Sequence, residues 1–171
     1  NDQFQPDFLR ISPNNKIPAI VDQDGPKGEA ISVFESGAIL QYLGRKTGQF
    51  YPSDEQSRVE VEQWLMWQMG GLGPMLGQNH HFSKFAPERI AYATERYVNE
   101  TKRLYGVLNK QLFGQNYVAG EYSIADMAIF PWILRYEWQQ IDINDYSNVK
   151  AYMERIQARP AVQRALALQV N

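Results

Sequence analysis

The sequence predicts a small α/β segment at the N-terminus, followed by an all-helical part that fills most of the 171 residues. Two short β-branched runs, at 19–21 and 31–34, enclose a stretch rich in turn formers, which is typical of an antiparallel hairpin. After Pro52, apolar residues recur every three or four positions, which is the period of an amphipathic helix. We place a linker at 47–52, so that one domain covers 1–47 and the other covers 53–171.

Two predicted helices flank the hairpin. Pro6 suits a first helical turn, and the Ser12–Pro13 pair ends the element, so we expect a short helix over 6–11. Apolar residues at helical spacing follow the second strand and predict a helix over 36–46 with Ser36 as its cap. A helix start carries free N–H groups and a partial positive charge. Ser36 is therefore either a plain structural cap or part of a site for a carboxylate or phosphate.

The helical part opens with a predicted capping box, in which Ser53 is the N-cap and Gln56 stands three residues later. The run GGLGPMLG at 70–77 then interrupts the helical pattern. Because glycine and proline disfavour a helix interior, we expect either a kink or a close approach of another backbone or a ligand. His80 and His81 diverge in direction on a helix, which favours a surface or pocket-lining pair over a metal site.

A long amphipathic helix is expected to begin at Pro87 and to run to about Leu112. Arg96 lies just off its apolar stripe, where an ordinary ion pair with Glu100 is the simplest interpretation. The segment 114–120 should end this helix, because glycine stands at both of its ends.

A second capping box, formed by Ser123 and Asp126, predicts the start of another helix. Nearly all positions from 124 to 134 are apolar or small, so this helix should be central and buried. We expect it to reach about Trp138 with a kink at Pro131. Two further helices are expected, over 148–158 and from 159 onward.

Composition excludes several classes of protein. The net charge is −2, which gives no sign of the basic face that nucleic-acid binding needs. No apolar run approaches the roughly 20 residues of a membrane span, and the polar start does not resemble a signal peptide. The 171 residues contain no cysteine, which excludes a disulfide scaffold, a Cys-ligated metal and a protein-thiol nucleophile within them. We therefore expect no nucleic acid and no membrane among the partners.

Four stretches carry a resemblance to a known family. NKIPAIVD at 15–22 and FESGAILQYL at 34–43 together resemble the glutathione-binding half of a cytosolic glutathione transferase. YVAGEYSIADMAIFPW at 117–132 resembles the fold-nucleating capping box in the helical half of that family. The closest likeness is to bacterial nu-class transferases, which are similar in WQMGGLGPMLGQNHHF at 67–82. The resemblance implies part of a thioredoxin-like domain followed by the all-helical domain of this family.

The nu-class resemblance implies an activity. Members of that class reduce small disulfides, conjugate electrophiles only weakly, and bind two glutathione molecules per site, so they need no protein cysteine. The resemblance thus implies a cytoplasmic homodimer that uses glutathione as co-substrate against a small disulfide or electrophile. An alternative remains open, namely a non-catalytic module that keeps the fold and serves binding or assembly.

The resemblance also implies a set of glutathione-binding residues: Gln3, Lys16, Ile17, Pro18, Glu35, Ser36 and Arg96. In this pattern Ile17 pairs its backbone with the cysteinyl part of glutathione, just before a cis bond at Pro18. Glu35 and Ser36 hold the γ-glutamyl amine and carboxylate. Lys16 and Gln3 meet the glycyl carboxylate, and Arg96 reaches bound glutathione across the dimer.

The chain starts at Asn1 and offers only two strands before Gly44. A lone hairpin is marginal in water, so we expect that the chain begins part-way through a domain. The family pattern implies a preceding β-α-β unit of about 30–40 residues, which carries the residue that faces the glutathione sulfur. We therefore expect no catalytic residue within these 171 residues, and we assign Asp126 a structural role only.

Overall fold

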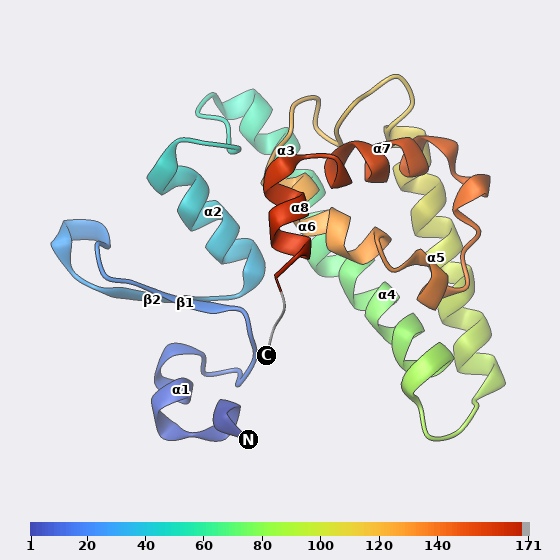
Figure 1. The fold of residues 1–171 in the computed structure, drawn as a ribbon, viewed down its shortest axis with the longest axis horizontal. Coiled ribbons are helices and arrows are strands. Elements are labelled where there is room, and N and C mark those ends of the chain that lie inside the picture. The colour runs from blue at the N-terminus through green and yellow to red at the C-terminus, as the bar shows by residue number, and fades with distance from the viewer. Residues whose placement is uncertain (169–171) are drawn as a thin grey trace. The chain divides into compact units, whose positions relative to one another are not determined.

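The computed structural model describes residues 1–168 and confirms the predicted fold class. The chain divides into two compact units, residues 1–53 and residues from 54 onward. The two-stranded sheet belongs to the first unit, and the long helices belong to the second (Figure 1).

The first unit contains the predicted hairpin and both predicted helices. Its elements are α1 (Pro6–Ile11), β1 (Ala19–Asp22), β2 (Ile31–Phe34) and α2 (Ser36–Thr47). The strands are antiparallel, with Ala19 opposite Phe34 and Asp22 opposite Ile31. This register brings the start of β1 beside the end of β2, so the chain entering the hairpin lies close to the chain leaving it.

The helix α2 is tied to the hairpin by polar contacts near its C-terminal end. The hydroxyl of Tyr42 donates to Oδ2 of Asp22 at 2.6 Å, and the ammonium of Lys46 contacts the same oxygen. The buried Gly44 leaves room for Tyr51, because a Cβ there would lie 2.7 Å from the Cβ of Tyr51. These contacts fix the direction of α2 relative to the sheet.

The second unit is helical throughout. Its α-helices are α3 (Glu55–Trp67), α4 (Gly73–His80), α5 (Ala91–Gln111), α6 (Ile124–Ile133), α7 (Ser147–Gln157) and α8 (Pro160–Leu166). The helices α4 and α5 lie side by side, α3 packs against α6, and α5 packs against α7 (Figure 1). The apolar core of the unit lies between these helices.

The glycine-rich run does not interrupt the helical backbone between α3 and α4. The chain passes from α3 into α4 through a π-helical turn, Gln68–Leu72, whose backbone stays helical on both sides. Gly73 and Gly77 face Trp132 of α6, and a Cβ on Gly73 would lie 3.1 Å from the indole nitrogen. These two glycines thus allow a large side chain to pack closely. The packing offsets part of the free-energy cost of placing glycine in a helix.

The starts of two helices differ from the prediction. Asp54, not Ser53, is the N-cap of α3, and its carboxylate accepts from the N–H of Ser57 at 2.9 Å. An aspartate is as good a cap as a serine, and its charge also suits the positive end of the helix. The long helix α5 begins at Ala91 instead of Pro87, because Ile90 has an extended backbone (φ −105°, ψ 94°).

The predicted capping box of α6 is confirmed. Ser123 is the N-cap, and the carboxylate of Asp126 accepts a hydrogen bond from the N–H of Ser123 at 2.8 Å. The helix is buried along most of its length, as expected, but it ends at Ile133 and not near Trp138. Its end follows Pro131 by two residues, and proline removes one helical hydrogen bond at that point. The chain then forms a 3-10 turn, Tyr136–Gln139.

Candidate functional site

A cavity of about 240 Å³ lies in the first unit, between the loop before β1 and the start of α2. Its lining residues are Ser12, Asn14, Lys16, Ile17, Pro18, Phe34, Glu35 and Ser36. Five of the seven residues expected to bind glutathione are therefore gathered around one cavity. The antiparallel register explains this, because it places the entry to β1 next to the exit from β2.

The loop that forms one wall is held from within. Ser12 is buried, and its hydroxyl donates to the carbonyl of Lys16 at 2.7 Å. The bond between Ile17 and Pro18 is cis, as predicted. Ile17 is 82% exposed, and the hydrogen bonds among residues 1–168 give its main-chain groups no partner. The loop therefore offers an N–H and a carbonyl to a ligand that lies along it.

The opposite wall is the turn from β2 into α2. Glu35 occupies the cap position with a positive φ (φ 69°, ψ 120°), and its carbonyl accepts from the N–H of Ile39 at 2.9 Å. Ser36 is the first residue of the helix and not its cap, so that part of the prediction is wrong. Its side chain nevertheless lines the cavity at the helix start, where N–H groups and the helix dipole favour an anion.

The charges around the cavity are of both signs. Lys16 supplies a cation, Glu35 supplies a carboxylate, and the start of α2 adds a partial positive charge. A ligand with separate anionic and cationic groups, joined by a peptide-like chain, matches this pattern. Within the described residues, no group of three or more His, Asp or Glu side chains is placed to hold a metal ion.

Two predicted site residues are not among those that line this cavity. Gln3 is exposed and lies in a short 3-10 turn, Asp2–Phe4. Arg96 belongs to the second unit, on α5, where it lines a different and larger cavity. Sequence reasoning missed Ser12, Asn14 and Phe34. Phe34 opens the motif at 34–43, and the only signal of Ser12 and Asn14 was their position just before the motif at 15–22.

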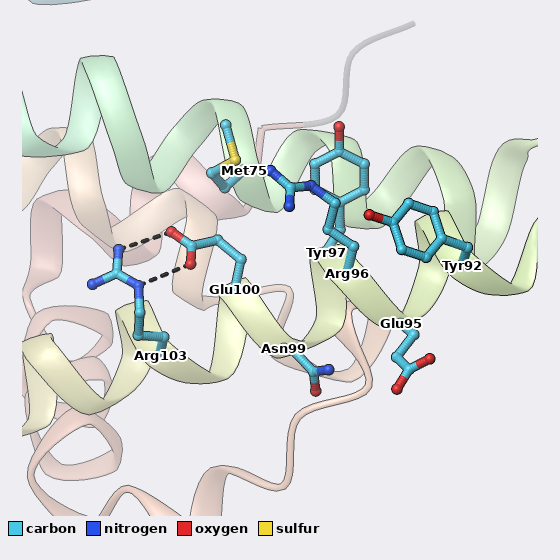
Figure 2. A pocket seen from close by; sticks show the side chains of 8 residues that line it. All are labelled: Met75, Tyr92, Glu95, Arg96, Tyr97, Asn99, Glu100 and Arg103. Atoms are coloured by element: carbon cyan, nitrogen blue, oxygen red, sulfur yellow. Dashed lines mark hydrogen bonds and ion pairs between the residues drawn. The ribbon is translucent and has the colours of Figure 1, made fainter.

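The cavity around Arg96 has a volume of about 680 Å³ and lies along one face of α5 (Figure 2). Its lining residues are Met75, Tyr92, Glu95, Arg96, Tyr97, Asn99, Glu100 and Arg103. All but Met75 of α4 come from α5, and the steps from 92 to 96, 99 and 103 are the helical spacing that could have revealed this face.

The expected ion pair between Arg96 and Glu100 is absent from the described residues. Glu100 instead forms two hydrogen bonds of 2.8 Å with Arg103, as Figure 2 shows. These bonds to Arg103 lower the pKa of Glu100 below its ordinary value. A planar guanidinium satisfies both carboxylate oxygens at once, so the i,i+3 partner replaces the i,i+4 partner. Arg96 instead lines the cavity.

Comparison with known proteins gives matches in both units. The family model described as glutathione S-transferase, N-terminal domain, matches residues 1–45, and the one described as glutathione S-transferase, C-terminal domain, matches residues 72–160. A curated relative, the disulfide-bond oxidoreductase YfcG of Escherichia coli (strain K12), is 58% identical over 168 residues. The alignment covers 96% of this chain and 77% of that protein, and two other bacterial relatives are covered over 65% and 59% of their length.

Two solved structures are similar along nearly the whole chain. A glutathione transferase from Burkholderia graminis, with two glutathione molecules bound per subunit, is 47% identical with a TM-score of 0.91. The match covers 96% of this chain and 72% of that one. A glutathione transferase from Pseudomonas putida, with one glutathione disulfide bound per subunit, is 45% identical with a TM-score of 0.93, over 99% of this chain and 76% of that one. Within residues 1–168, the structure contains no helix of the length and apolarity that crossing a membrane requires.

Proposed function

The chain belongs to the glutathione S-transferase family, and from this premise we propose that it acts in glutathione-dependent reduction of small disulfides. One observation carries the proposal: the cavity of the first unit gathers a cation, a carboxylate, an open stretch of main chain and a helix start. Glutathione has one ammonium, two carboxylates and two peptide groups, and each finds a partner of suitable chemistry there. The name of the YfcG relative and the ligands in the two similar structures support the same substrate class.

Each end of the tripeptide is assigned to one wall. The γ-glutamyl carboxylate lies at the start of α2 beside Ser36, and its ammonium pairs with Glu35. The cysteinyl part lies along the loop, with its peptide groups on the main chain of Ile17, next to Pro18. Lys16 meets the glycyl carboxylate. This orientation places the thiol at the open side of the loop, where a disulfide can approach.

The reaction needs two thiols, and glutathione supplies both. The thiolate of one glutathione attacks a sulfur of the disulfide, forms a mixed disulfide and expels one thiolate. A second glutathione thiolate attacks the glutathione sulfur of the mixed disulfide, which yields glutathione disulfide and expels the other thiolate. Two electrons pass from two glutathione molecules to the substrate, and the expelled thiolates take up the two protons. The residues 1–171 contain no cysteine, and this sequence of steps requires none from them.

Three further parts of the proposal concern the assembly. We assign Gln3 to the glycyl carboxylate together with Lys16, and Arg96 to glutathione held by a second copy of the chain in a homodimer. Residues 1–47 are taken as part of the glutathione-binding domain, and residues from 53 onward as the helical domain. Arg96 is exposed and lines the larger cavity, while Glu100 forms its ion pair with Arg103, which supports a role of Arg96 toward an anion. We propose a cytoplasmic location because the chemistry needs a pool of reduced glutathione.

The test is titration calorimetry of the chain with glutathione. Ser36→Ala should weaken binding roughly tenfold, because it removes a hydrogen bond to a charged group. Ser32→Ala is the matched control, since Ser32 is exposed in the same unit but does not line the cavity. Equal affinities of the Ser36 variant and the parent chain would contradict the site. Oxidation of glutathione by a small disulfide in the presence of the chain tests the reaction itself.

A further inference from the structure

A buried polar cluster joins three helical segments of the second unit. At its centre is Gln139, fully buried in the 3-10 turn after α6. Its side chain makes three hydrogen bonds: Nε2 to the Trp132 carbonyl at 2.7 Å, Nε2 to the His80 ring at 3.0 Å, and Oε1 from the Tyr105 hydroxyl at 2.7 Å. Asn79, beside His80 on α4, donates to the Gln139 carbonyl at 3.0 Å and to Thr101 of α5 at 2.9 Å.

The orientation of the Gln139 amide follows from this geometry. The Trp132 carbonyl can only accept, so the NH₂ group must face it, and Oε1 must face the Tyr105 hydroxyl. The second hydrogen of the same NH₂ group points to Nε2 of His80. That ring nitrogen is therefore an acceptor without a proton. His80 is neutral, with its proton on Nδ1.

The charges near His80 also oppose its protonation. Lys84 lies on the π-helical turn that follows α4, and Arg135 lies between α6 and the 3-10 turn, so both flanking segments present cations. From α5 the facing titratable group is the hydroxyl of Tyr105, through Gln139. His80 as a whole is 9% exposed. Burial lowers the pKa of His80 below its ordinary value, and Arg135 and Lys84 lower it further.

A protonated His80 has no compatible arrangement of Gln139. With the amide as it stands, an N–H of the ring meets the NH₂ group. With the amide reversed, Oε1 meets the Trp132 carbonyl, and two acceptors face each other at a hydrogen-bond distance. Either arrangement leaves buried polar groups without partners, which destabilises the closed form.

We propose that His80 and Gln139 form an acid-sensitive latch between α4 and residues 134–140, which is closed while His80 is neutral and opens when it is protonated. The Gln139 carbonyl also accepts from Asn79, and Asn79 bridges α4 to α5. Opening therefore loosens the pairing of α4 with α5 as well. This pairing supports the cavity around Arg96, to which α4 contributes Met75 and α5 contributes the remaining lining residues.

Nitrogen-15 NMR of the chain tests the closed state directly, because the sequence contains only two histidines. His80 should show a proton on Nδ1 and none on Nε2 at neutral pH, and it should titrate below about 6.5. The variant His81→Gln identifies the two sets of signals. A proton on Nε2 of His80 at neutral pH, or a pKa at or above 6.5, would overturn the proposal.

The opening is followed by tryptophan emission as the pH is lowered. Trp132 and Trp138 report on the latch, since their ring centroids lie 5.9 and 5.8 Å from that of His80. A reversible change should follow the His80 titration in the parent chain and in His81→Gln, and should be missing in His80→Gln, which stays neutral and can still accept from Gln139.

A second variant covers the case in which His80→Gln does not fold. Lys84→Gln, at an exposed position, should move the transition to higher pH by removing one cation. A transition that persists unchanged in His80→Gln, or does not move in Lys84→Gln, would count against the latch.

Discussion

The two units of this chain divide stability and binding between them. Among residues 1–168, twenty buried apolar side chains lie in the helical unit, and only Ile39 and Tyr51 lie in the first unit. Buried polar side chains of the helical unit such as Asp126 and Gln139 are paired within that unit. In the first unit, Lys16 and Glu35 line the cavity and are open to a ligand, whereas Asp22, Tyr42 and Lys46 pair with one another and are not part of its lining. A large core can hold the fold, so a small unit can expose the groups that a ligand needs.

The largest expected effect is the destabilisation of the helical unit when Asp126 is replaced. The glutathione site should be unaffected. Its carboxylate is fully buried and accepts from the N–H groups of Val118 and Ser123 and from the Tyr152 hydroxyl, at 2.8 to 3.0 Å. Asp126→Ala leaves these donors without partners. We expect the free energy of unfolding to fall by about 3 kcal/mol, since each buried unsatisfied group costs about 1–3 kcal/mol.

Urea denaturation measures this effect, and Tyr152→Phe is the matched control because it removes only one of the bonds to Asp126. The control should cost about 1 kcal/mol. In the folded fraction, neither variant should change glutathione affinity, because Asp126 lies outside the cavity of the first unit. A loss of affinity in fully folded Asp126→Ala would show that the two regions are not independent.

The features that the sequence predicts well are local. The capping box of α6 depends on two residues three apart, and the hairpin depends on two runs separated by a turn, so short-range pattern is sufficient for both. The family assignment is confirmed for the same reason, because its motifs are continuous stretches. Five of the predicted binding residues lie around one cavity, and their contacts with a ligand stay a prediction.

The features that the sequence does not predict depend on distant partners. The sequence predicts that His80 and His81 form a surface or pocket-lining pair. His80 is instead buried and contacts Gln139, which lies 59 residues further along the chain. The start of α7 shows the same limit: no local side chain caps it, and Asn109 of α5 accepts from the N–H groups of Asn148 and Val149. The glycine run likewise depends on Trp132, a distant residue that packs against Gly73 and Gly77. No periodicity in the sequence encodes these contacts.

A smaller effect, of opposite sign for stability and binding, is expected at Glu35. Its backbone (φ 69°, ψ 120°) lies where side chains are disfavoured and glycine is not. Glu35→Gly should raise the free energy of unfolding by about 1 kcal/mol through relief of this strain. The same change removes the carboxylate from the cavity, so calorimetry should record weaker binding of glutathione.

Gln140→Gly is the matched control for Glu35→Gly. Gln140 also has a positive φ (φ 58°, ψ 40°), but it lies in the helical unit. This variant should gain stability without any change in affinity. If Glu35→Gly lowers stability, or if both variants bind glutathione equally well, strain at the site is not linked to binding.

The smallest effect concerns the hydrogen bonds and the ion pair that hold α2 against the hairpin. These contacts are polar, whereas the helices of the second unit pack mainly through apolar side chains. Hydrogen bonds from Lys46 and then Tyr42 lower the pKa of Asp22 from 3.8 to about 2. Because the folded-state pKa is below the unfolded value, the carboxylate stabilises the folded unit fully above about pH 4. This contribution is lost as the pH falls from 3.8 towards 2. Carbon-13 NMR of the Asp22 carboxyl group should therefore give a midpoint near 2.

The variants Lys46→Met and Tyr42→Phe separate the two causes. Lys46→Met should raise the pKa of Asp22 more than Tyr42→Phe does, because Lys46 supplies the larger effect. Added salt should also raise this pKa in the parent chain, since the pair is partly exposed and ions screen it. The buried bonds of Asp126 should respond far less to salt. An Asp22 midpoint near 3.8 in the parent chain would mean that its contacts with Lys46 and Tyr42 are not formed in solution, and α2 would then need another contact to keep its place beside the hairpin.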